Sequence, residues 1–141
     1  MKMRRPHIVP LSRQAVALLR EQQEETKHLK TNWVSPNQPR PSKPMSNNTI
    51  LFGIGRLGYK GDMTGHGFRA LARTALRENL GYAVDVIEAQ LAHAKGDSVR
   101  RAYDRTTFIP QRREMMQAWA DFLEGIEATG AIPLAKEIDG P

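Results

Sequence analysis

Two histidines, an arginine, a lysine and a tyrosine are the residues of this chain that could perform chemistry together. His66 and Arg69 lie three residues apart in the stretch MTGHGFRALARTAL, while His93 lies in QLAHAKGD, Tyr103 in RRAYDR and Lys2 beside two arginines. Tyrosine can act as a covalent nucleophile. Because the unperturbed pKa of its phenol is about 10, it needs cations and a base beside it to act as a nucleophile at neutral pH. The combination indicates a metal-free site for phosphoryl transfer.

Each of these residue types suits one part of such a reaction. The planar guanidinium of arginine donates two parallel hydrogen bonds to phosphate oxygens. Lysine can protonate a leaving alkoxide, and histidine can take or position a proton. Taken singly, each residue also has an ordinary structural interpretation, such as a histidine stabilised by the dipole at a helix C-terminus for His93. Only the set as a whole points to chemistry.

The composition limits the class of protein. The chain has 141 residues, of which 40% are hydrophobic and 26% charged, which is typical of one globular domain with a modest core. It has no cysteine, which excludes disulfides, cysteine-based zinc fingers and thiol catalysis. No apolar run approaches the roughly 20 residues of a membrane helix, and the first residues lack the apolar region of a signal peptide. The formal net charge of +6 favours nucleic acid as a partner.

The elements that must position the candidate residues are mainly helices. Apolar residues recur at helical spacing in several stretches. Ser12 and Thr64 are good N-caps, and Gly81 is a good helix stop. The pattern predicts helices over residues 12–27, 46–55, 65–80 and 85–93 and from about 111 onward, with a helical turn or two in SVRRAYDR.

One short segment has a different pattern. The run His7-Ile8-Val9, closed by Pro10, predicts one strand of a hairpin, whose turn or other strand would involve residues 2–5. We therefore expect a mainly α fold with a small β-hairpin or sheet remnant (α+β), in one domain over residues 1–130 followed by a flexible tail over 131–141. The predicted core consists of Phe68, Leu71, Leu76, Ile87, Leu91, Trp119 and Leu123.

The order and spacing of these motifs resemble the catalytic domain of tyrosine recombinases, the phage integrase family, in particular integrases of prophages and genomic islands. Arg69 follows His66 by 3 residues, His93 follows Arg69 by 24, and Tyr103 follows His93 by 10. The stretches KMRRPHIVPLS, KPMSNNTI, GYAVDVIEAQLAHAKGDSVRRAYDR and RREMMQAWADFL extend the resemblance from Lys2 to about Leu123.

The resemblance implies a role for each residue in site-specific DNA recombination. Tyr103 would attack the scissile phosphate and form a 3′-phosphotyrosyl link, releasing a 5′-hydroxyl. Arg69 would bind the non-bridging oxygens, and Lys2 would be the general acid. His66 and His93 would share proton handling and phosphate positioning, with His66 favoured as the general base. No metal or other cofactor is implied. The expected DNA contacts are Arg73, Arg77, Arg4, Arg5 and Lys43.

The resemblance also implies partners and one departure from the family pattern. The partners would be double-stranded DNA and other recombinase protomers in a four-protomer synapse, in the bacterial cytoplasm and without a membrane. The family has a second catalytic arginine upstream of the lysine hairpin, and no such residue stands before Met1. We therefore expect a fold incomplete at its amino terminus and a chain that cleaves DNA poorly by itself, since losing one such donor costs about 10²–10³ in rate.

Three other interpretations stay open at this stage. The chain could be a DNA-binding remnant of an integrase without catalysis, as the missing arginine suggests. It could use the same tyrosine chemistry for relaxation of DNA, as topoisomerases do. A plain helical structural domain is the third, but it leaves the joint spacing of the candidate residues as coincidence.

Overall fold

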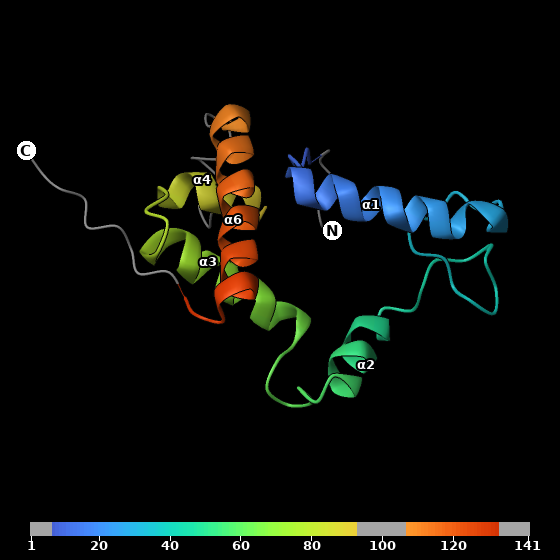
Figure 1. Cartoon of the computed structure of the whole chain (residues 1–141). Coiled ribbons are helices and arrows are strands. Elements are labelled where there is room, and N and C mark those ends of the chain that lie inside the picture. The colour runs from blue at the N-terminus through green and yellow to red at the C-terminus, as the bar shows by residue number, and fades with distance from the viewer. Residues whose placement is uncertain (1–6, 93–106, 133–141) are drawn as a thin grey trace, which may run out of the picture. The chain divides into compact units, whose positions relative to one another are not determined.

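A computed structural model of the chain describes residues 7–92 and 107–132. In these residues the elements are α1 (Arg13–Thr26), the short 3-10 helix η1 (Lys27–Leu29), α2 (Thr49–Arg56), α3 (Gly65–Glu78), α4 (Val84–Gln90) and α6 (Ile109–Thr129) (Figure 1). The chain divides into two compact units. The smaller unit is Arg13–Leu71, and the larger unit consists of Met1–Ser12 and Ala72–Pro141. The mainly α prediction is confirmed.

The core of the larger unit lies where α3, α4 and α6 meet. Leu76 of α3, Val86 and Ile87 of α4 and Met115 of α6 form one buried cluster, in which Met115 is fully buried. Six partly buried residues surround this cluster: Leu80, Tyr82, Leu91, Phe108, Met116 and Trp119. Burial raises the pKa of Tyr82, and the nearby Glu114 carboxylate raises it further, so the neutral phenol is the form that this site stabilises.

Local sequence signals fix both ends of α3. The Thr64 hydroxyl accepts a hydrogen bond from the Gly67 N–H at 3.0 Å, which satisfies one of the free donors of the first turn. At the other end Gly81 has a φ of 69°, and the Tyr82 N–H donates to the Leu76 carbonyl at 3.0 Å. This is the left-handed cap that glycine adopts without a steric penalty. The predicted N-cap at Thr64 and the predicted helix stop at Gly81 are both confirmed.

The smaller unit has little core of its own. Ile54 is its one buried residue, and no side chain of α1 is buried. A looped connection between η1 and α2 is closed by an isolated bridge between Pro36 and Pro44 and by the Trp33 ring N–H, which donates to the Ser42 carbonyl at 3.0 Å. The unit therefore exposes much of the apolar surface that its helices carry.

The predicted strand at His7–Pro10 is wrong. Among the described residues this segment forms no strand and has no backbone ladder partner. It is attached instead through side chains, since His7 and the Ile8 carbonyl are bound by residues of other elements. A β-branched run indicates an extended backbone, but a strand also requires a neighbouring strand. Residues 2–5, the helical turn predicted in SVRRAYDR and the tail beyond residue 132 lie outside the described residues.

The predicted core is correct in part. Leu76 and Ile87 are buried, and Leu91 and Trp119 pack against them. The prediction is wrong for three core residues, since the exposed fractions of Phe68, Leu71 and Leu123 are 50%, 48% and 43%. Helical periodicity identifies the apolar face of a helix, but burial requires another element to cover that face, and the described residues provide none at these positions.

The core cluster makes the larger unit sensitive to loss of Met115. Met115→Ala should lower the free energy of unfolding by about 2–5 kcal/mol, because the substitution removes buried methylenes and leaves a cavity. Ile132→Ala is the matched control, since Ile132 is 65% exposed and should change stability by less than about 0.5 kcal/mol. Urea denaturation of the chain measures both values. Equal losses from the two substitutions would contradict this description of the core.

Candidate functional site

Helix α3 carries two of the five predicted catalytic residues. His66 lies exposed in its first turn, and Arg69 lies half-buried three residues later. Side chains three residues apart on a helix are neighbours on its surface. The Thr64 cap fixes the start of this turn. The structure therefore brings an imidazole and a guanidinium together at the amino-terminal end of one helix.

The same helix carries two of the predicted DNA contacts, and these differ in their surroundings. Arg73 Nε donates to Glu88 Oε1 of α4 at 2.6 Å, and the Arg73 and Glu88 side chains are 47% and 15% exposed. This ion pair joins α3 to α4 inside the larger unit. Arg77 lies exposed in the last turn of α3, where a cation also stabilises the helix dipole. Arg73 therefore has a structural partner that the sequence pattern did not reveal.

The remaining predicted residues fall in different places. Lys43 is exposed in the connection before α2, where its N–H donates to the Arg40 carbonyl at 2.9 Å. Five others lie outside the described residues: Lys2, Arg4, Arg5, His93 and Tyr103. The convergence of His66, Arg69 and His93 on one basic surface therefore stays a prediction.

A buried arginine that the sequence analysis did not single out joins three segments of the larger unit. Arg112, on the first turns of α6, is 3% exposed. Its Nε donates to the Gln90 side-chain oxygen at 2.7 Å, and its Nη1 donates to the Thr107 carbonyl at 3.2 Å. Its Nη2 donates to the Ile8 carbonyl. These partners lie at the end of α4, just before α6 and in the amino-terminal segment.

His7 completes this cluster. Its Nε2 lies 3.1 Å from the Gln90 carbonyl and 3.4 Å from Arg112 Nη2. One ring nitrogen cannot donate and accept at the same time. Because a carbonyl can only accept, the shorter contact identifies His7 Nε2 as the donor to the Gln90 carbonyl. Arg112 Nη2 therefore donates to the Ile8 carbonyl and not to His7. The amino-terminal segment is thus tied to the end of α4 twice, once directly and once through Arg112.

The electrostatics of the cluster are those of a buried cation among neutral acceptors. Burial lowers the pKa of Arg112, but an arginine stays charged at neutral pH. Its acceptors among the described residues are two backbone carbonyls and one amide oxygen. A sequence signal for Arg112 did exist, because residues 112, 116, 119 and 123 follow the helical spacing of one face. A charged residue in register with an apolar face is a candidate for burial.

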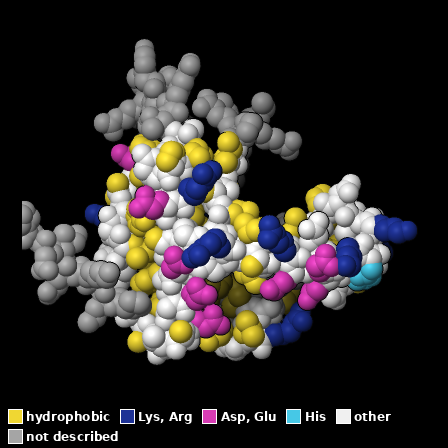
Figure 2. Space-filling view, turned by 45° about the horizontal axis from the view of Figure 1, so that its top comes forward, with side chains coloured by type: hydrophobic (Ala, Val, Ile, Leu, Met, Phe, Trp, Pro, Cys, Tyr) yellow, Lys and Arg dark blue, Asp and Glu magenta, His cyan; other side chains and the backbone are white. Residues whose placement is uncertain are grey.

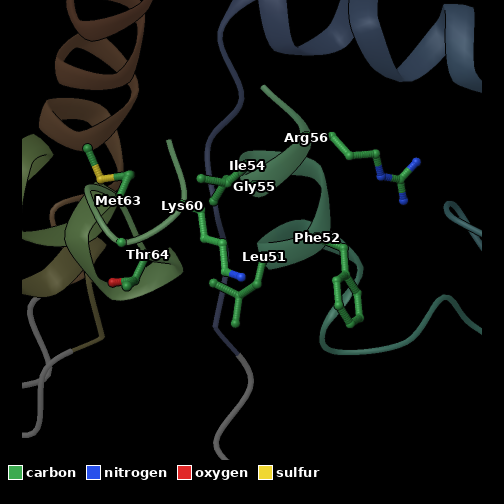
Figure 3. Close-up of a pocket in the computed structure, with 9 residues that line it drawn as sticks. Leu51, Phe52, Ile54, Gly55, Arg56, Lys60, Met63 and Thr64 are labelled. Atoms are coloured by element: carbon green, nitrogen blue, oxygen red, sulfur yellow. The ribbon is translucent and has the colours of Figure 1, made fainter. Parts of the chain in front are cut away.

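The smaller unit contains a cavity of about 500 Å³. Figure 3 shows the residues that line it, which come from α2 and from the segment leading into α3. Leu51, Phe52, Ile54 and Met63 give the cavity an apolar lining, with Arg56 and Lys60 as its cations. These lining residues include no imidazole or carboxylate. The cavity does not include His66 or Arg69.

Three further features of the described residues are their surface charge, their metal-ligating side chains and the hydropathy of their helices. Figure 2 shows acidic side chains interspersed with basic ones on the face in view, together with exposed hydrophobic side chains. Within residues 7–92 and 107–132, no group of three or more His, Asp or Glu side chains is arranged to hold a metal ion. None of the helices in those ranges is both long and apolar enough to cross a bilayer.

Comparison with known families identifies the class of this protein. The profile of the Phage integrase family matches residues 1–108. This range is more than half of the chain, and it includes Lys2, His66, Arg69, His93 and Tyr103. The chain belongs to the phage integrase family.

Individual relatives are prophage and phage integrases. The chain is 46% identical to the prophage integrase IntZ of Escherichia coli strain K12 over 138 residues, which are 97% of this chain and 33% of the relative. It is 43% identical to the prophage integrase IntA of the same strain over 136 residues, which are 95% of this chain and 32% of the relative. The integrase of Shigella phage Sf6 is 41% identical over 124 residues, 88% of this chain and 32% of the relative. The chain thus spans about a third of the length of these relatives. No solved structure matches it significantly.

The ion pair between Arg73 and Glu88 should make a small contribution to stability. A double-mutant cycle with Arg73→Gln and Glu88→Gln is expected to give a coupling of about 0.2–1 kcal/mol, because Arg73 is half exposed and water screens the pair. The coupling should shrink as salt is added. Denaturation of the four proteins at low and high salt measures it. A coupling of zero at low salt would show that the pair does not join α3 to α4 in solution.

Proposed function

We propose that this chain is the catalytic part of a tyrosine recombinase that cuts and rejoins DNA at specific sites. The observation that carries the proposal is the family match over residues 1–108, because that range contains Tyr103, Arg69, His66, His93 and Lys2. Identity of 46% over 138 residues to a prophage integrase supports the same conclusion. The position of His66 and Arg69 three residues apart on α3 is compatible with the roles of base and phosphate-binding group that the proposal gives them.

The proposed cleavage step is a transesterification at phosphorus. The Tyr103 oxygen forms a bond to the scissile phosphorus, and the bond from phosphorus to the 5′-oxygen breaks. His66 accepts the phenol proton, and Lys2 donates a proton to the departing 5′-oxygen. Arg69 and His93 stabilise the charge on the non-bridging oxygens, as preorganised donors do in phosphoryl transfer. The phosphotyrosyl ester conserves the energy of the bond, so attack by a 5′-hydroxyl reverses the step and reseals DNA without a cofactor.

The partners in this proposal are a DNA duplex and further recombinase protomers. Basic side chains at Arg77 and Lys43 are exposed and available to phosphates. A complete strand exchange involves two duplexes and, by the family pattern, four protomers in the bacterial cytoplasm. The chain spans about a third of the length of the relatives it matches, so by itself it should cleave more slowly than a full-length integrase.

Covalent capture of DNA tests the nucleophile. The chain, grafted in place of the matching 138 residues of the IntZ relative, should form a protein–DNA adduct that resists detergent on a nicked suicide duplex carrying the attachment site. Tyr103→Phe should abolish the adduct, because it removes the attacking oxygen and changes little else. Denaturing gel electrophoresis with labelled DNA measures the yield. Tyr82→Phe is the matched control, since Tyr82 packs against the core and should leave the adduct intact.

Two results would contradict the proposal. An adduct that survives Tyr103→Phe would exclude Tyr103 as the nucleophile. A graft that binds the duplex but never forms an adduct would favour a DNA-binding protein without catalysis.

DNA affinity should depend on Arg77 more than on Arg73. Arg77→Gln should lower affinity and reduce the slope of log affinity against log salt by about 1, as expected for one phosphate contact. Arg73→Gln should have a smaller effect, because Glu88 already neutralises much of that charge. Fluorescence anisotropy at several salt concentrations measures both slopes. If Arg73→Gln reduced the slope of log affinity against log salt as much as Arg77→Gln does, the ion pair between Arg73 and Glu88 would have to open on DNA.

A further inference from the structure

One segment of the smaller unit carries the net positive charge of the whole chain. Residues 26–61 contain six Lys and Arg side chains and no Asp or Glu. The other 105 residues contain 15 Lys and Arg against 15 Asp and Glu, so their formal charges cancel. A surface that serves only solubility mixes both signs, whereas a segment of one sign attracts a polyanion. The six cations, all of them exposed, are Lys27, Lys30, Arg40, Lys43, Arg56 and Lys60.

The connection between α1 and α2 holds two of these cations in a closed loop (Figure 1). The Lys43 N–H donates to the Arg40 carbonyl at 2.9 Å, which is the hydrogen bond of a tight turn and keeps the two Cα atoms within about 7 Å. The Thr31 hydroxyl ties the loop across its width, since it donates to the Pro41 carbonyl at 2.8 Å. Four prolines in the loop fix their own φ angles. Arg40 and Lys43 therefore start from neighbouring, fixed backbone positions.

The surroundings of these cations suit phosphate groups. Among the residues that the structure describes, no carboxylate forms an ion pair with Lys30, Arg40 or Lys43, whereas Lys27 pairs with Glu24 of α1. Exposed Asn, Gln and Ser side chains stand between the cations. These residue types, with Lys and Arg, make the contacts to phosphate and sugar in protein–DNA complexes. The centre of a protein–protein interface is instead poor in charge, so the composition of the loop favours a nucleic acid backbone.

We propose that residues 27–45, named here the basic loop, bind the phosphate backbone of duplex DNA, with Arg40 and Lys43 as the principal contacts. The inference deepens the proposed function, since it takes duplex DNA as the partner from it. The family resemblance implied Lys43 alone in this segment, and the loop adds Arg40 beside it. Phosphate contacts orient the protein on the duplex and supply affinity without reading sequence. A loop that is closed before binding loses less conformational freedom on DNA than an open chain would.

Fluorescence anisotropy of the 141-residue chain with a labelled duplex of arbitrary sequence, at several salt concentrations, tests the contacts. The double variant Arg40→Gln and Lys43→Gln should reduce the slope of log affinity against log salt by about 2, one for each phosphate contact, and should lower affinity at least about tenfold near 0.1 M salt. The matched control is Arg20→Gln with Arg113→Gln, which removes two exposed cations that lie outside residues 26–61. Its slope should change less than about half as much.

A second variant tests whether loop closure matters apart from charge. Thr31→Val removes the hydroxyl that binds the Pro41 carbonyl and keeps every cation. Affinity should fall about threefold with an unchanged salt slope, because the same phosphates are contacted by a loop that must first be ordered. Thr129→Val is the matched control, since the Thr129 hydroxyl donates to the Gly125 carbonyl within α6. It should leave DNA affinity unchanged.

The outcomes separate this inference from the proposed function. Equal loss of slope in the two double variants, or no binding of the duplex at low salt, would overturn the basic loop as a DNA contact. Full affinity in Thr31→Val would overturn the role of loop closure. Adduct formation by the IntZ graft is measured independently, so a graft without an adduct would overturn cleavage and leave the binding result standing. A slope loss of about 2 that is confined to the Arg40 and Lys43 variant would establish the inference.

Discussion

The larger unit depends on a cation buried among neutral oxygens. Arg112 is separated by 104 positions from Ile8, yet its guanidinium binds the carbonyl of that residue. Removing a charge from water costs several kcal/mol. Each hydrogen bond to a charged donor stabilises the folded state by about 1.5–3 kcal/mol, so three well-placed acceptors are needed to offset the cost of removing the charge from water. The same requirement fixes where the amino-terminal segment, the end of α4 and the start of α6 must lie.

Helix α3 connects this arrangement to the candidate chemistry. Its last turns supply Leu76 to the core and Arg73 to the ion pair with Glu88, while His66 and Arg69 lie on its first two turns. A helix fixed by packing at one end and by a threonine cap at the other holds its side chains in defined directions. Sites built on such elements keep their geometry better than sites on loops. The smaller unit, with Ile54 as its one buried residue, contributes much less packing energy.

Sequence patterns predicted the helices well because those signals are local. The Thr64 cap, the Gly81 stop and the apolar periodicity each act within one or two turns. The patterns failed where the outcome depends on a neighbouring element: among the described residues, His7–Pro10 has no strand beside it, and Phe68 and Leu71 have no element that covers them. The Glu88 partner of Arg73 and the Gln90 and Ile8 partners of Arg112 were also missed, because they lie 15, 22 and 104 positions away in sequence. Spacing alone singled out His66 and Arg69 on α3; their role and their relation to His93 and Tyr103 stay predictions.

Hydrogen exchange tests the central claim most directly, because it reports the opening of each segment separately. The 141-residue chain and its Arg112→Gln variant are compared by mass spectrometry of proteolytic peptides. Amide protection should fall together in residues 7–12, 87–92 and 107–112 of the variant, while that of α2 in the smaller unit is unchanged. Unaltered protection, or a loss confined to residues 107–112 on Arg112's own side, would contradict the claim that one guanidinium holds the three segments together.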